Sequence, residues 1–500
     1  MKESLTAIIY LEPDQVSLRI IETPSLTIVT DVRSGALNVG EQQIANYAQN
    51  MAAIVNNLEG FKQVITDYQV TKVKFYGDYE DLDPVSARYV AEQLRVRVGW
   101  QIEWLNNKQL LAQSMAYMMT ALPEFTNLSR HNMYLLSIGL SSMTLAYFHH
   151  GNFTQAWDID LGDAKINQLV QQLRKTAANP TEIIQDYISS KLEYLKSELQ
   201  QKKQTVMLIQ NALALNHLFI PQGQQIAEVL QDKIVRRYQQ LAAPVQKRTQ
   251  QLTTSTQQAD LLLPNSLVVA RTIRLIQPAR VYLTTVSMMD GLSHGIAVKN
   301  DRTQSQIDKM IRTAADNISA RYGVDTAHRD FVTHFSLQFF DALRPIHQLG
   351  PHARLLLEIA SRVDDIGNFI NQRGHYRHSA YILEANPLIG LSDQDNRIIA
   401  EVARYHSAES PDISQAHYRH LDNDIQMPVA KLAAILRLVD ALDDSRLQKI
   451  SRVELKLQDN RLIITASASD DLVLEKWSFT KKSHLFNDVY GLQPVLREKR

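Results

Sequence analysis

The sequence predicts a mixed α/β protein in which two sheet-containing halves precede an all-helical domain and a small α/β domain ends the chain. Two successive groups of alternating apolar segments occupy residues 5–162, each with strand-like patterning. From residue 302 to residue 440 the apolar residues recur at helical spacing, and alternation returns after residue 445. Five hundred residues are also too many for one hydrophobic core.

The first half reads as a meander followed by alternating helices and strands. Three alternating segments open it, and a helix, a strand, a second helix and a short strand follow. The predicted strands are 5–12, 15–23, 26–37, 71–77 and 101–106, and the predicted helices are 42–65 and 83–99.

The second half repeats the opening meander, which indicates a duplicated α/β architecture rather than one sheet. Its predicted strands are 133–140, 142–151 and 153–162. Residues 163–262 read as mainly helical, residues 279–287 as a strand, and 288–295 as a turn.

The third part reads as helix throughout. Phe331, Phe335 and Phe339 follow one another at one-turn spacing, and Pro345 is predicted to end that helix. Beyond Ser445 two strands and a small α/β cap are expected.

Composition excludes several classes of function. Lys+Arg and Asp+Glu number 53 each, so no net charge attracts a polyanion, and a nucleic-acid partner is not expected. The basic segment 233–250 reads as a solvated helix face. Cysteine is absent, which excludes disulfides, thiolate metal sites and a Cys nucleophile. Apolar runs are too short to span a bilayer, so no membrane partner and a cytoplasmic location are expected.

One polar stretch interrupts the helical part. "SRVDDIGNFINQRGHYRHSAYILEA", residues 361–385, contains Asp364, Asp365, His375 and His378 among apolar positions. Two interpretations stay open. The stretch is part of a metal or phosphate site, or it is a polar bend whose His and Asp side chains pair with one another between core helices.

Four segments of the helical part, taken together, resemble a known family. They are "VTHFSLQFFDALRPIH", "GHYRHSAYILEANPLIGLSDQD", "IAEVARYHSAESP" and "VAKLAAILRLVDALDDSR", in that order. They are similar to the HD-type helical domain of the exopolyphosphatase/guanosine-pentaphosphate phosphohydrolase (Ppx/GppA) family. That resemblance implies two actin-like (ASKHA, ribonuclease H-like) lobes at 1–125 and 126–300, an HD-type domain at 301–447, and a small α/β domain at 448–500.

The resemblance also implies a candidate metal site, with Mg or Mn as the cofactor. His328 matches the early His of HD-type phosphohydrolases, and the late Asp is Asp440. The pair Asp364–Asp365 stands where His-Asp is usual, and a carboxylate there favours harder ions. His378 and His406 match the intermediate histidines. We expect His328, Asp365 and Asp440 to hold the ion, with His378 and His406 facing the same cavity.

The phosphate loops of the family are degenerate in this sequence. Where the family has Asp, Gly and Ser in its first loop, this chain has Tyr10, Glu12 and Pro13. Ser137 replaces the Asp of the second loop, and Leu110 falls at the general-base Glu. A Glu repels phosphate, and Pro lacks an N–H donor. The remnants of phosphate binding are Gly139, Ser142, Gly291 and Gly295.

Three functions follow as expectations. By resemblance the chain releases terminal phosphate from polyphosphate or guanosine pentaphosphate, with weak or lost activity because the actin-like catalytic residues are replaced. Alternatively it is a non-catalytic sensor of a phosphorylated ligand or an interaction protein, or the HD-type site alone hydrolyses a phosphate ester. The resemblance implies a homodimer.

Overall fold

The computed structural model describes most of the chain as two compact units, residues 1–310 and 311–500, with the division inside one helix. The described residues are 4–35, 37, 47–79, 82–177, 180–199, 204–234, 236, 256–297 and 301–499. Much of the predicted basic segment 233–250, and the start of the predicted helix 42–65, therefore lie outside the described residues.

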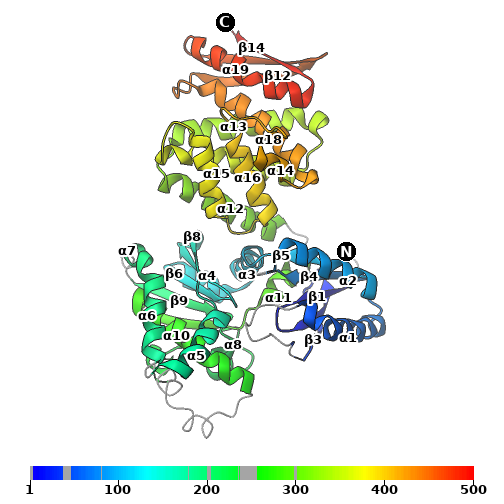
Figure 1. The fold of residues 1–500 in the computed structure, drawn as a ribbon, viewed down its shortest axis with the longest axis vertical. Helices are drawn as coiled ribbons and strands as arrows, with labels where there is room; N and C mark the ends of the chain where they lie inside the picture. The colour runs from blue at the N-terminus through cyan, green and yellow to red at the C-terminus, as the bar shows by residue number, and fades with distance from the viewer. Residues whose placement is uncertain are drawn as a thin grey trace. The chain divides into compact units, whose positions relative to one another are not determined.

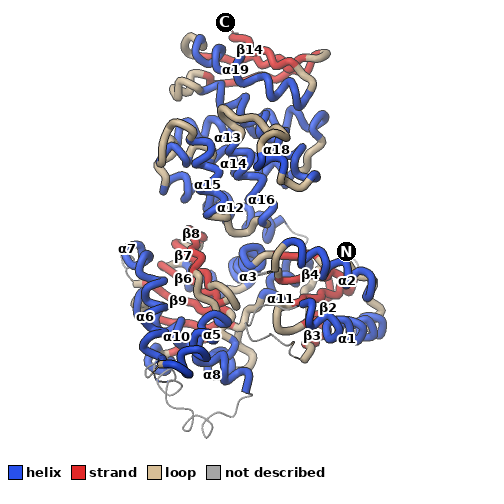
Figure 2. Tube along the Cα trace, viewed as in Figure 1, coloured by secondary structure: helices blue, strands red, loops and turns tan. Residues whose placement is uncertain are grey.

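The first sheet has five strands in the order β3-β2-β1-β4-β5 (Figures 1 and 2). β1, β2 and β3 form an antiparallel meander. β4 and β5 extend the sheet on the other side of β1 as parallel strands. The central strand β1 is buried on both faces, which explains its unbroken run "TAIIYL". The strands are β1 (Ser4–Leu11), β2 (Val16–Thr23), β3 (Ile28–Arg33), β4 (Lys72–Asp78) and β5 (Glu103–Leu105). Helix α1 (Tyr47–Asp67) connects β3 to β4, and helix α2 (Pro84–Val98) connects β4 to β5.

The second sheet repeats this plan, in the order β10-β11-β9-β6-β7-β8. β6, β7 and β8 form an antiparallel meander, and β9 and β11 extend it in parallel from β6. The strands are β6 (Asn132–Ile138), β7 (Met143–His149), β8 (Asn152–Ile159), β9 (Thr205–Gln210), β10 (Ile226–Val229) and β11 (Arg280–Thr284). The two sheets share this plan, which confirms the predicted duplicated α/β architecture.

The remaining helices of the first unit come before, between and after the strands of the second sheet. They are α3 (Asn107–Ala121), α4 (Pro123–Ser129), α5 (Asp163–Thr176), α6 (Pro180–Leu192), η1 (Glu193–Leu195), α7 (Lys196–Leu199), α8 (Leu213–Phe219), α10 (Thr256–Ile276) and α11 (Met288–Ala297). Helix α11 returns to the first lobe, where Asp290 forms a 2.6 Å ion pair with Arg19 of β2.

The second unit begins with a helical domain (Figure 2). Its helices are α12 (Asp301–Arg321), α13 (Thr326–His347), α14 (Pro351–Val363), η3 (Ile366–Phe369), α15 (His375–Ala385), α16 (Asp393–Arg404), α17 (Ala416–Arg419), α18 (Asn423–Asp440) and η4 (Ala441–Asp443). A three-stranded sheet in the order β12-β13-β14 follows, together with one helix. These elements are β12 (Ile450–Gln458), β13 (Arg461–Ala468), α19 (Val473–Tyr490) and β14 (Gln493–Lys499).

Two predicted elements were wrong, and a third prediction was incomplete. The described part of residues 163–262 is mainly helical as predicted, but it also contains the strands β9 and β10, whose short apolar runs were indistinguishable from helix by period alone. Residues 288–295 form helix α11 rather than a turn. Pro345 does not end α13, because a proline near a helix end removes only one hydrogen bond. The helix continues to His347, and the next residue, Gln348, adopts φ 56°.

Candidate functional site

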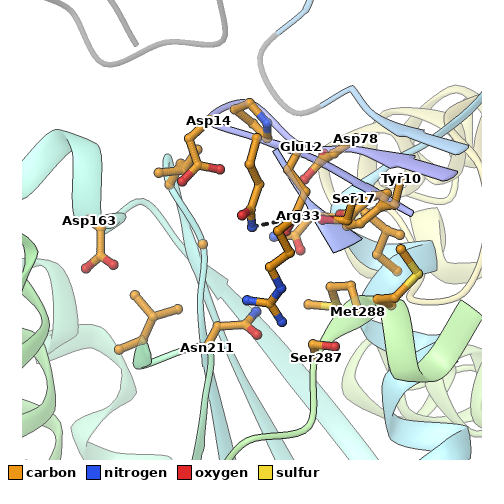
Figure 3. A pocket seen from close by; sticks show the side chains of 18 of the residues that line it. Tyr10, Glu12, Asp14, Ser17, Arg33, Asp78, Asp163, Asn211, Ser287 and Met288 are labelled. Atoms are coloured by element: carbon orange, nitrogen blue, oxygen red, sulfur yellow. Dashed lines mark hydrogen bonds between the residues drawn. The ribbon is translucent and has the colours of Figure 1, made fainter. Parts of the chain in front are cut away.

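A cavity of about 170 Å³ lies between the two sheet-containing lobes of the first unit. Figure 3 shows its side chains, with Arg33 and Glu12 from one lobe facing Asn211 and Asp163 from the other. Tyr10 of β1 and Leu110 of α3 line this cavity, both almost fully buried. Ser137 of β6 does not line it, but its hydroxyl oxygen lies 3.4 Å from the amide nitrogen of Asn211, which does.

The cavity is rich in carboxylates. Five acidic side chains and two arginines line it: Glu12, Asp14, Asp31, Asp78, Asp163, Arg19 and Arg33. Arg19 forms ion pairs with Asp31 and Asp290, at 2.6 Å each. Acidic side chains thus outnumber the arginines, so the lining of this cavity offers little positive charge to a polyanion.

Two of these acids have altered proton affinities. Burial, reinforced by the charges of Asp14 and Asp78, raises the pKa of Glu12 to about 8. Its Oε2 accepts hydrogen bonds from Gln15 at 2.8 Å and from Ser17 at 3.3 Å. Burial raises the pKa of Asp163, at the start of α5, to about 7.

Replacing Glu12 with glutamine should make stability less dependent on pH. A carboxyl group whose folded pKa is raised to about 8 from 4.5 stabilises the fold below pH 4.5, and that contribution is lost as pH rises through 8. We expect the unfolding midpoint of the unmodified chain to fall as the pH is raised through this window, and Glu12→Gln to flatten that fall. Thermal unfolding followed at several pH values measures it, and identical pH profiles for the two chains would contradict it.

The four predicted phosphate remnants lie in two pairs, because the backbone N–H of Gly139 donates to the carbonyl oxygen of Ser142 at 2.8 Å and the two glycines of α11 share one helix. Gly139 lines the cavity, whereas Ser142, Gly291 and Gly295 are not among the described residues that do. Gly291 and Gly295 lie within α11, and a Cβ at Gly291 would lie 2.6 Å from the backbone nitrogen of Ser114 on α3. The bare Cα of Gly291 thus allows α11 to approach α3 closely.

A second polar cluster lies in the core of the helical domain. It brings together five side chains from three helices and two turns between helices: His328, Asp365, His375, His406 and Asp440. The Nε2 atom of His328 lies 3.2 Å from Asp440 and 3.9 Å from Asp365. One oxygen of Asp365 lies 3.6 Å from His375 and 3.8 Å from His406. Four of these five residues were predicted to meet.

Two of the histidines present bare nitrogens to each other. Nδ1 of His406 lies 2.6 Å from the carbonyl oxygen of Ala403, and Nδ1 of His375 lies 3.0 Å from that of Gln372. A carbonyl only accepts, so each Nδ1 carries the proton, and in the neutral ring Nε2 then holds a lone pair. These two Nε2 atoms are 3.0 Å apart. Two lone pairs at that distance repel unless a proton or a metal ion lies between or beside them.

Asp365 completes a set of three ligand atoms. The two Nε2 atoms and one carboxylate oxygen of Asp365 lie within 4.8 Å of one another. Its Oδ1 atom is buried and accepts no hydrogen bond from the described residues. Two imidazoles and a carboxylate suit Mn, Fe or Zn, and backbone contacts at Nδ1 are the usual orientation of metal-binding histidines. The residues therefore fit a divalent ion.

Two cations border the cluster. Arg446 lies 2.6 Å from Oδ2 of Asp365, and Lys482 of α19 binds Oδ2 of Asp440. Burial by itself raises the pKa of Asp365, but the neighbouring His406 ring and the Arg446 guanidinium outweigh it and the pKa is lowered. Burial opposes the charge of Asp440 as well, yet Lys482 and His328 hold its pKa well below the usual range. Both carboxylates are thus ionised, as metal binding requires.

The pKa values of His406 and His328 are shifted in opposite directions. Burial lowers the pKa of His406 to about 4, so its ring is neutral near pH 7. Burial also opposes the charge on His328, but hydrogen bonds to Asp440 and Asp443 raise its pKa to about 10. Asp443 contacts Nδ1 of His328 at 2.8 Å and so fixes the orientation of the ring.

Two of the predicted residues stand apart from the ligand atoms. Asp364 is buried, and burial together with the neighbouring Asp365 charge raises its pKa well above the usual range. His378 lies one turn beyond His375 on α15 and makes none of the ion pairs of the described cluster. His375 occupies the place expected for His378.

Sequence analysis named His375 in the polar stretch but gave the ligand position to His378, and it missed Asp443, Arg446 and Lys482 as members of the cluster. His375 belongs to the same "GHYRH" motif, so the signal was present but ambiguous between two histidines. Asp443 lies in the quoted segment ending "VDALDDSR", and Arg446 is its last residue. Lys482 lies in the terminal domain, and no local pattern connects it to Asp440.

Comparisons with known proteins agree with the resemblance. Residues 311–483 match the family model "Ppx/GppA phosphatase, domain III". A curated relative, guanosine-5'-triphosphate,3'-diphosphate pyrophosphatase of Photobacterium profundum, is 24% identical over 154 residues. That match covers 31% of this chain and 30% of the relative, so the chain spans less than a third of the relative's length.

Solved structures show a distant similarity. The Ppx/GppA family member of Aquifex aeolicus has 13% identity and a TM-score of 0.47, over 59% of this chain and 98% of that one. An exopolyphosphatase from Cytophaga hutchinsonii has 13% identity and a TM-score of 0.49, over the same shares. Among the described residues, no helix is long and apolar enough to cross a membrane.

Proposed function

The chain belongs to the Ppx/GppA family, and from this premise we propose that it is a metal-dependent phosphohydrolase whose active site is the HD-type cluster of the helical domain. One observation carries the proposal. The bare Nε2 atoms of His375 and His406 and a carboxylate oxygen of Asp365 lie within 4.8 Å of one another.

Each residue of the site has a distinct task in this proposal. His375, His406 and Asp365 hold the ion, and Asp440 and His328 border it. A bound divalent ion supplies a Lewis acid and lowers the pKa of water. Arg446 is 40% exposed at its side chain and already faces the carboxylate of Asp365, so its guanidinium can also attract a phosphate group that enters from solvent.

The substrate class follows from the same charges. Arg446 and Lys482 favour an anion, and the curated relative is named for a phosphorylated guanosine nucleotide. We propose a phosphorylated nucleotide as the substrate. We also propose that the chain is a homodimer, as the resemblance implies, and that it acts in the cytoplasm.

The direct test is hydrolysis by the purified full-length chain after removal of metal. Dialysis against a chelator is followed by addition of Mn²⁺ or Mg²⁺, and phosphate release is measured from p-nitrophenyl phosphate and from guanosine pentaphosphate. We expect hydrolysis that depends on the added ion. Absence of hydrolysis with either ion, together with no retained metal, would refute the proposal and favour a non-catalytic sensor.

The cavity between the two actin-like lobes should contribute little to catalysis. Tyr10, Leu110 and Ser137 stand where the family has its metal ligand, general base and loop Asp, and carboxylates line the cavity. Loss of a general base alone costs about 10²–10⁴ in rate. We therefore expect little Mg-dependent phosphate release from long-chain polyphosphate. A turnover near the median of about 10 s⁻¹ for ordinary enzymes would contradict this expectation.

A further inference from the structure

A second group of potential metal ligands lies on the same helical domain, away from the HD-type cluster. Glu384 near the end of α15, Glu401 of α16 and His417 of α17 each offer one ligand atom, and these atoms lie within 4.8 Å of one another. Glu384 and His417 are exposed, so the group opens to solvent.

The main evidence for a site here is the buried carboxylate of Glu401. Its side chain is 1% exposed, and neither of its carboxylate oxygens accepts a hydrogen bond from the described residues. Such a carboxylate is costly to keep in a folded protein, because it has lost its hydration and has gained no hydrogen bond in exchange. Helix α16 is amphipathic, and a hydrophobic residue would serve at this position if packing alone mattered.

The neighbouring groups satisfy Glu401 only in part. Nε of Arg404 lies 3.6 Å from Glu401, and a terminal nitrogen lies 3.7 Å from Glu384. Both distances exceed hydrogen-bonding range, and neither Nε of Arg404 nor the hydroxyl of Tyr405 has a hydrogen-bond partner among the described residues. Burial raises the pKa of Glu401, although Arg404 and the Tyr405 hydroxyl are close enough to oppose that shift. When Glu401 is ionised, one guanidinium stands beside two carboxylates, and a bound cation would balance the remaining negative charge.

We propose that Glu384, Glu401 and His417 form a second site for a divalent first-row ion such as Zn²⁺ or Mn²⁺. Two carboxylate oxygens and one imidazole nitrogen are a donor set that these ions accept. This site goes beyond the proposed hydrolytic function and does not depend on it.

The site has a structural role. Helix α17 is only four residues long and therefore needs tertiary support. Tyr418, next to His417, already packs edge-on against Tyr405 at the end of α16, with 6.2 Å between ring centroids. An ion held by Glu401 and His417 fixes α17 to the end of α16. His406 follows that same helix end, so the second ion also steadies a ligand of the HD-type cluster.

Counting bound ions tests the proposal. The full-length chain is dialysed against a chelator, equilibrated with Zn²⁺, freed of excess ion, and analysed for zinc per chain by elemental mass spectrometry. We expect two ions for the unmodified chain and one for either Glu401→Gln or His417→Ala. His420→Ala is the matched control, because His420 is also exposed and follows the same short helix, and it should retain two.

Separate variants distinguish this site from the hydrolytic one. His375→Ala should lose the other ion and keep the one at Glu401. Glu401→Gln has nearly the same volume as the original residue and removes a buried charge, so its metal-free unfolding midpoint should equal or exceed that of the unmodified chain. The increase in the midpoint on adding Zn²⁺ should be smaller in Glu401→Gln.

Two results would overturn the inference. One is that Glu401→Gln and His417→Ala bind as much zinc as the unmodified chain. The other is a lower metal-free midpoint in Glu401→Gln with unchanged zinc content, which would mean that Glu401 serves only as the ion-pair partner of Arg404. In both cases loss of the ion in His375→Ala would leave the proposed hydrolytic site intact.

Discussion

The variant His375→Ala should lose the ion of the proposed metal site and at least about 100-fold of the proposed metal-dependent hydrolysis. Removing even an indirect partner of a metal ligand commonly costs about 10–100-fold in affinity or activity, and His375 supplies a ligand atom itself. Its Nε2 also lies 3.0 Å from Nε2 of His406, so the alanine variant leaves that nitrogen without its facing partner. Metal content after dialysis and phosphate release from p-nitrophenyl phosphate measure the two losses.

His378→Ala is the matched control. Both histidines lie on α15, one turn apart, and both lie in the same sequence motif. His378 takes part in none of the ion pairs of the described cluster, so its replacement should leave metal content and hydrolysis close to those of the unmodified chain. If the two variants behave alike, the ion is not held where the bare nitrogens face each other.

Gly367→Ala should both destabilise the helical domain and disrupt the site. A Cβ at this position would lie closer than 3.0 Å to the carbonyl oxygen of His375 and to the backbone nitrogen of Ser379. The backbone N–H of Gly367 also donates to the Ser379 hydroxyl at 2.9 Å. Either η3 or the start of α15 must move, and overpacking of this kind costs about 1–3 kcal/mol or more. The moved segment carries Asp365 on one side and His375 on the other.

Thermal unfolding and metal content after dialysis test this second expectation together. Gly60→Ala is the control, because Gly60 lies in the interior of α1 with open space around its Cα, and alanine there should stabilise the helix by about 0.5–1 kcal/mol. Gly60→Ala should keep its metal. A Gly367→Ala chain with an unchanged midpoint and full metal content would show that the junction tolerates a side chain.

The sequence predicted the parts of the fold that periodicity governs. The apolar runs of β1 and β7 were sufficient to place the two meanders, because burial on one or two faces imposes a visible pattern. Short strands within a helix-rich segment, such as β10, lack that pattern. Helix α11 was missed because its Gly291 and Gly295 suggest a turn in isolation, whereas Gly291 serves close packing.

The cluster in the helical domain was predictable where each member stands alone on its element and ambiguous where two candidates stand together. His328, His406 and Asp440 lie on separate helices or at a helix end, so each had one candidate. His375 and His378 are three residues apart and share one face of a helix, so spacing alone cannot choose between them. The choice is made by where α15 begins: Gly374 adopts φ 75°, and His375 is the first helical residue.

The contact between Lys482 and Asp440 has a consequence for how the chain is made. Lys482 follows Asp440 by 42 residues, so it leaves the ribosome after every helix of the helical domain. Until then Asp440 and its neighbouring carboxylates lack that positive partner, although the helices that carry them have already emerged and can pack. The nascent helical domain therefore has an excess of negative charge at its centre, and the later arrival of α19 neutralises it. A ribosome-bound chain that stops before residue 473, where α19 begins, has Asp365, His375 and His406 but not this balance of charge.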